Sequence, residues 1–117
     1  MVASPRPQGF PPEKRLRKRA EFSKVYAHGR AWSHPLLRLR VLPNGLGVSR
    51  FGFAIGKRVG KAVVRNRTKR RLRETVRQMD IRPGYDVVII GQPAAATSSY
   101  QALRAGVMDL LTRARLL

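Results

Sequence analysis

The chain has 117 residues, and its 25 Lys and Arg residues against 6 Asp and Glu residues give a formal net charge of +19. This length predicts a single domain, and a charge this large favours nucleic acid or an anionic membrane surface as the partner. No apolar run reaches the roughly 20 residues of a membrane-spanning helix, no signal peptide is recognisable, and the lack of Cys excludes disulfides and thiolate metal sites, so we expect a cytoplasmic location.

The chain begins with a basic, Pro-rich segment. Residues 1–13 contain four Pro and one Gly, so we expect them to form a flexible leader. Residues 14–117 then form the single domain, whose charge makes it a candidate for binding nucleic acid.

A first helix is predicted from Arg19 to His28, with Gly29 just past its end. Phe22, Val25 and Tyr26 have the i, i+3, i+4 spacing of one helix face. For Phe22 and Tyr26 two interpretations stay open. The rings belong to the core, or they face outward and stack on unpaired bases, which stabilises roughly 1–3 kcal/mol per base.

Two strand patterns follow this helix. Residues 30–33 form a short strand, and residues 36–42 form a clearer one that alternates in polarity. Arg38 and Arg40 lie on one face of the second strand, opposite three apolar side chains. This sheet face is therefore predicted to be basic.

Turn-forming residues at 43–47 predict a hairpin from the second strand to a third strand at Ser49–Gly56. Arg50 shares one face of that third strand with Gly52 and Ala54. Such small residues would let a ligand or a backbone segment come close to the sheet.

The segment from Lys57 to Arg73 contains nine Lys or Arg residues and no acid. Its composition predicts a helix from about Lys61 to Met79. At about 100° per residue, one face of this helix is apolar and carries Val64, Thr68, Leu72, Thr75, Val76 and Met79. The polar stripe consists of Asn66, Arg70, Arg73 and Arg77, with Lys69 beside it and Arg65 at the edge of the apolar face.

Like charges repeat along this helix for several turns. A face that only keeps a protein in solution usually mixes Glu with Lys, because like charges at i, i+4 repel each other. A polyanion would relieve that repulsion. We therefore interpret the helix as a surface that lies on phosphates. The alternative, a helix whose charges are merely solvated, is much weaker.

Two further elements complete the chain. Residues 85–90 form an apolar run that predicts a strand buried on both faces, hence a central one. Thr97 or Ser98 can cap a last helix that runs to about Ala114. The order helix, three strands, helix, strand, helix predicts an α+β fold: a small two-layer α/β sandwich with about four strands and three helices.

Nothing in the sequence indicates catalysis by the polypeptide. No set of its acids and histidines has the spacing of a metal site, and no HExxH motif, P-loop or nucleophile elbow is present. Gly56-Lys57-Arg58-Val59-Gly60-Lys61 lacks the full Walker pattern, so we expect no small-molecule cofactor.

The residues from Lys57 to Arg73 resemble the motif of the protein component of bacterial ribonuclease P, with Arg65-Asn66-Arg67 at its core. The likeness extends to Glu21-Phe22 and Val25-Tyr26 in the first helix and to the strands at 51–55 and 85–89. It covers nearly the whole chain, from about Leu16 to Leu111.

This resemblance implies a four-stranded sheet flanked by three helices, with a left-handed crossover through the basic helix. It also implies the role of a protein subunit in an RNA enzyme that removes the 5′ leader from precursor tRNA. In that enzyme the RNA subunit carries out the cleavage with bound Mg²⁺. The protein binds that RNA and the single-stranded leader, and it interacts with no membrane.

The resemblance also implies site residues. The basic helix and motif that would face RNA comprise Lys57, Arg58, Lys61, Arg65, Asn66, Arg67, Lys69, Arg70 and Arg73, with an RNA-bound Mg²⁺ near Asn66. The resemblance places Phe22 and Tyr26 in the leader cleft, and the arginines that strand alternation puts on the sheet face, Arg38, Arg40 and Arg50, would complete it. Arg40 stands where some relatives have an aromatic residue, so the cleft here would depend more on charge.

The rival interpretation is a ribosomal or other general RNA-binding protein without an enzyme role, which composition alone would favour. The ordered Arg65-Asn66-Arg67 context, with aromatic residues upstream, favours the ribonuclease P family instead.

Overall fold

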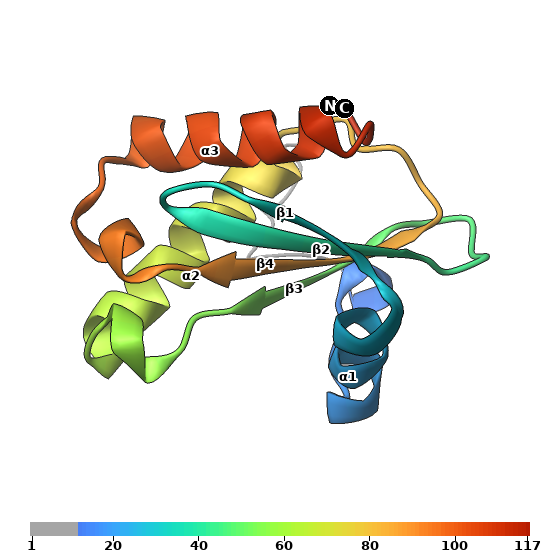
Figure 1. The fold of residues 1–117 in the computed structure, drawn as a ribbon, viewed down its shortest axis with the longest axis horizontal. Helices are drawn as coiled ribbons and strands as arrows, with labels where there is room; N and C mark the ends of the chain where they lie inside the picture. Colours follow the sequence, from blue (N-terminus) through green and yellow to red (C-terminus); the bar gives the residue numbers. More distant parts are fainter. Residues whose placement is uncertain (1–11) are drawn as a thin grey trace, which may run out of the picture.

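The computed structural model describes residues 12–117, and the predicted leader at 1–13 lies almost wholly outside this part of the chain (Figure 1). The helices are α1 (Arg19–His28), α2 (Ala62–Arg77) and α3 (Tyr100–Arg113). The strands are β1 (Arg30–Ser33), β2 (Leu37–Pro43), β3 (Arg50–Ala54) and β4 (Tyr85–Gly91). Short 3₁₀ turns are η1 (Pro12–Lys14), η2 (Lys57–Val59) and η3 (Pro93–Thr97). The α+β class and the order αβββαβα are confirmed.

The sheet has the strand order β1-β2-β4-β3. β4 lies between its neighbours, antiparallel to β2 and parallel to β3. The predicted hairpin between the second and third strands is therefore wrong. The loop at Asn44 does reverse the chain, and Asn44 Oδ1 accepts a hydrogen bond from Leu46 N at 2.7 Å. The apolar β4 takes the central position because it can be buried on both faces there, and this separates β2 from β3.

The main core lies between one face of the sheet and helices α2 and α3. Its sheet side chains come from alternate positions of β2 and β4, including Leu39 and Ile89. Leu72 of α2 and Leu103 of α3 are both fully buried against them. The alternation of polarity in β2 thus places its apolar side in this core, as predicted.

Helix α1 packs on the opposite face of the sheet, below the strands in the view of Figure 1, where α3 lies above them. A second apolar cluster forms there around Leu16, Val25 and Val88, with Phe22 partly buried beside them. The predicted two-layer packing therefore describes the main core, and α1 adds a helix on the second face.

Two local predictions are corrected by the structure. The last helix is capped by Ser99, whose side chain accepts a hydrogen bond from Ala102 N, whereas Thr97 ends the preceding turn η3. Gly52 admits the Phe22 ring, a side chain where a ligand or a backbone segment was expected, and it also borders a small hollow beside that ring. A Cβ at Gly52 would lie 2.5 Å from two carbons of the Phe22 ring.

Candidate nucleic-acid interface

The solvent side of α2 carries a stripe of polar and basic side chains. Asn66, Arg70 and Arg73 are exposed and lie opposite the buried face of Thr68 and Leu72, as the helical spacing predicted. In the described part of the chain, the ion pairs involve Arg50, Arg77 and Arg113, whereas Arg70 and Arg73 take part in none of them. The stripe therefore presents charge that no carboxylate neutralises at these two positions.

The beginning of α2 adds to this positive surface. Lys57, Arg58 and Lys61 are exposed just before the helix, and the N-cap Lys61 makes no capping hydrogen bond through its side chain. The first N–H groups of a helix carry a partial positive charge that attracts anions. The three cations and the helix end thus reinforce one another.

Three other arginines of α2 contact the protein itself. Arg65 Nε donates to Gly60 O at 3.1 Å, and Arg67 Nη2 donates to Ala96 O at 3.2 Å. Arg71 Nη1 donates weakly to Ser98 O at 3.4 Å. Arg67 and Arg71 therefore link α2 to the segment before α3. Sequence reasoning missed these contacts because the acceptors are backbone carbonyls, which leave no pattern in side-chain type.

A groove of about 490 Å³ opens on the α1 face of the sheet, and its lining includes Tyr26, Arg38 and Arg40. Arg40 Nη1 donates to Tyr26 O at 2.8 Å, which ties the end of α1 to β2. Tyr26 is 38% exposed, while burial of its hydroxyl raises the pKa of this side chain. The structure thus brings together three of the five predicted cleft residues, with one ring and two cations.

Phe22 lines a separate, smaller hollow of about 150 Å³ beside β3. Lys69 and Arg73 of α2 line the same hollow, together with Gly52. A ring and two cations from distant parts of the sequence therefore meet here. The Phe22 ring packs in the α1 cluster and also borders an opening, so stacking of this ring on bases stays a prediction.

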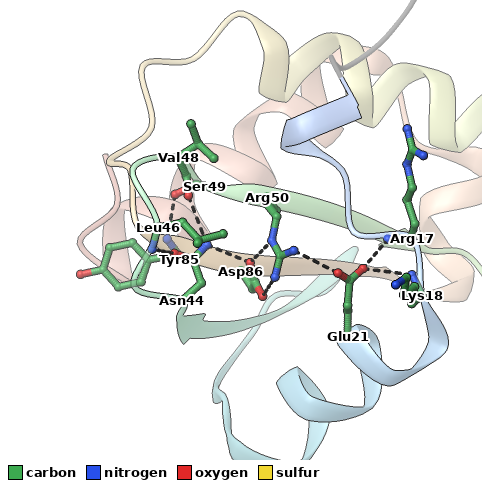
Figure 2. Close-up of polar contacts among 10 residues, drawn as sticks. All are labelled: Arg17, Lys18, Glu21, Asn44, Leu46, Val48, Ser49, Arg50, Tyr85 and Asp86. Carbon is green, nitrogen blue, oxygen red and sulfur yellow. Dashed lines mark hydrogen bonds and ion pairs between the residues drawn. The ribbon is translucent and has the colours of Figure 1, made fainter.

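Arg50, the fifth predicted cleft residue, is enclosed by acids (Figure 2). It makes a bidentate pair with Asp86, and its remaining amino group contacts Glu21 at 3.0 Å. The hydrogen bond with Asp86 raises the pKa of Arg50. Backbone N–H donors at Lys18 and Arg17 are the main cause of the lowered pKa of Glu21. Asp86 is thus the main counter-ion of Arg50.

Residues 12–117 contain no group of three or more His, Cys, Asp or Glu side chains placed to hold a metal ion. In the same part of the chain, every helix is too short or too polar to cross a bilayer.

Comparisons with known proteins agree with this architecture. The family model described as Ribonuclease P matches residues 10–115. The ribonuclease P protein component of Dehalococcoides mccartyi (strain CBDB1) is 44% identical over 103 residues, covering 88% of this chain and 86% of that protein. Its counterpart in Symbiobacterium thermophilum is 45% identical over 106 residues, covering 88% of this chain and 92% of that protein. The solved structure of the Staphylococcus aureus RNase P protein is similar in fold, with a TM-score of 0.81 at 24% identity over 88% of this chain and 96% of that one.

Proposed function

The chain belongs to the family of bacterial ribonuclease P protein components, and we propose that it binds the catalytic RNA subunit through α2 and holds the single-stranded 5′ leader of precursor tRNA on the α1 side of the sheet. Its family makes it the protein component of a ribonucleoprotein endoribonuclease. We assign the hydrolysis of the phosphodiester to the RNA subunit, as the resemblance to this family implies.

The observation that carries this proposal is the meeting of rings and cations at two openings. Arg73 and Lys69 border the hollow beside Phe22, and Arg38 and Arg40 border the groove beside Tyr26. Cations that contact phosphates, together with rings that stack on bases, suit single strands of any sequence. A leader differs in sequence from one precursor to the next, so recognition without base reading is what this task requires.

Magnesium is the metal ion that the family resemblance implies, and residues 12–117 show no cluster of acids or histidines that would hold it. Mg²⁺ prefers several oxygen ligands in octahedral geometry and keeps part of its water. Near Asn66 the exposed side chains of α2 supply one amide oxygen among cations and no carboxylate. We therefore assign Mg²⁺ chiefly to the RNA subunit, and no step of catalysis to the protein.

Cleavage of precursor tRNA at low magnesium tests the proposal. With ribonuclease P RNA from the same source, we expect cleavage to depend on this protein and to disappear when the RNA is omitted. The physical reason is that added cations reduce the repulsion between the RNA subunit and its substrate when Mg²⁺ is scarce. A protein that binds RNA tightly and leaves cleavage unchanged would instead support the ribosomal-type alternative, against which the family membership already argues.

The two rings of α1 are expected to respond differently to truncation. Tyr26→Ala should weaken binding of precursors that carry a leader, spare mature tRNA and change stability little, because Tyr26 is exposed. Phe22→Ala should also lower the unfolding free energy by about 2 kcal/mol, below the 3–5 kcal/mol typical of a fully buried Phe. Denaturant unfolding and binding to both tRNA forms measure these effects. Equal losses of affinity for precursor and mature tRNA would remove Tyr26 from the leader site.

A further inference from the structure

We propose that Arg50 is a positioning residue of the leader site: held between Asp86 and Glu21, it fixes α1 on the sheet and does not itself bind leader phosphates. This inference rests on the proposed function, because it concerns the same site.

Each of the three nitrogens of Arg50 already donates to a carboxylate, which occupies three of its five N–H donors. Its Nε and Nη2 atoms contact the two carboxylate oxygens of Asp86 at 2.8 and 2.7 Å, and Nη1 contacts Glu21 Oε2 at 3.0 Å (Figure 2). Bidentate pairs of this kind are strong and directional. The two carboxylates neutralise the charge of this guanidinium, so Arg50 itself offers a phosphate little net attraction.

The contacts continue beyond Arg50 on both sides. Glu21 Oε1 accepts hydrogen bonds from Arg17 N at 2.8 Å and Lys18 N at 3.0 Å, where α1 begins. Asp86 Oδ1 accepts one from Asn44 Nδ2 at 2.9 Å, in the loop between β2 and β3. The network therefore joins the start of α1 to β3, β4 and that loop.

Helix α1 is held on the sheet by a small apolar cluster and by this network together. Within the helix only Val25 is buried, and the helix packs against β2 and β4 without contacting α2 or α3 extensively. Figure 1 shows α1 projecting away from the sheet on the side opposite α3. The Glu21–Arg50 pair holds its first turn, and the Arg40 contact to Tyr26 O holds its last. Because Phe22 and Tyr26 lie in the stretch that these two attachments hold, their position follows that of the helix.

The substitution Glu21→Gln distinguishes a positioning role of the Glu21–Arg50 pair from a simple effect of net charge on the attraction of RNA. The substitution raises the formal net charge from +19 to +20, so attraction alone predicts tighter binding of every RNA. A positioning role predicts weaker binding of RNA that carries a leader, because a neutral amide holds Arg50 less strongly and α1 loosens. Asp80→Asn is the matched control, since it makes the same change of charge at an exposed acid outside the ion pairs of residues 12–117.

The experiment measures equilibrium binding of precursor tRNA and mature tRNA to the holoenzyme reconstituted with wild-type protein, Glu21→Gln or Asp80→Asn. We expect Glu21→Gln to weaken precursor binding by about three- to fivefold, the effect of one part-exposed ion pair, and to leave mature tRNA unchanged. Asp80→Asn should leave both unchanged or bind both slightly more tightly. Circular dichroism and thermal unfolding establish that Glu21→Gln is folded, and Arg50→Lys, which retains the charge but not the bidentate fork, should weaken precursor binding in the same way.

The outcomes distinguish this inference from the proposed function. If the wild-type holoenzyme binds precursor no better than mature tRNA, the leader-binding function fails and the inference fails with it. Suppose instead that the wild-type holoenzyme binds precursor tRNA more tightly than mature tRNA. If Glu21→Gln then binds precursor as tightly as Asp80→Asn does, the positioning role of Arg50 is overturned while the proposed function stands. The salt dependence gives a further criterion. Arg50→Met should keep the wild-type log–log slope, whereas a slope lower by about 0.7–0.9 would show that Arg50 contacts a phosphate directly and would overturn the inference.

Discussion

Replacing Arg70 and Arg73 together by Ala is expected to lower the affinity for ribonuclease P RNA on the order of tenfold and to flatten its salt dependence. The log–log slope should fall by about 0.7–0.9 for each phosphate that the protein no longer neutralises, because fewer counterions are released on binding. Both side chains are exposed on the same side of α2, and neither is neutralised by an acid in the described part of the chain. Binding titrations over a range of salt concentrations measure the affinity and the slope together.

A matched pair of substitutions controls for the change in net charge. The double substitution Arg82→Ala and Arg104→Ala also removes two positive charges. These residues lie in the loop before β4 and in α3, outside the groove beside Tyr26 and the hollow beside Phe22. We expect this pair to weaken binding much less and to leave the slope near its wild-type value. Equal losses of affinity from the two pairs would show that the helix attracts RNA only through its overall charge.

Leu72→Ala is expected to lower the free energy of unfolding by about 3 kcal/mol, within the 2–5 kcal/mol range for a fully buried Leu. Leu72 is fully buried on the inner face of α2, in the core shared with the sheet and α3. A domain of this size has a total stability of about 5–15 kcal/mol, so the loss is a large part of it. Chemical denaturation followed by circular dichroism measures the change.

Val63→Ala on the same helix provides the comparison. Val63 is 77% exposed, and its truncation should change the free energy of unfolding by less than about 0.5 kcal/mol. A loss below about 1 kcal/mol for Leu72→Ala would contradict the packing of α2 described above. A loss of the expected size would show that α2 is held rigidly, which the stripe of Asn66, Arg70 and Arg73 needs in order to present a fixed surface to RNA.

Local patterns in the sequence were sufficient for the elements and their faces. The spacing of Thr68 and Leu72 against Asn66 and Arg70 predicted which side of α2 is buried, because helical periodicity depends only on neighbours within two turns. The run at 85–90 predicted a central strand for the same kind of reason. The basic motif around Asn66 indicated the family, which the comparisons confirm.

Three features were decided by the tertiary structure alone: the neighbour of each strand, the face that α1 covers and the partners of individual arginines. Turn residues near Asn44 can reverse the chain, but they cannot exclude β4 from the space between β2 and β3. Arg50 and Arg70 are the same residue type, yet Arg50 meets Asp86 and Glu21 whereas Arg70 stays exposed. The sequence by itself determined periodicity, charge and family, and only the fold decided which charges remain available to RNA, because an ion pair depends on distances between residues far apart in the chain.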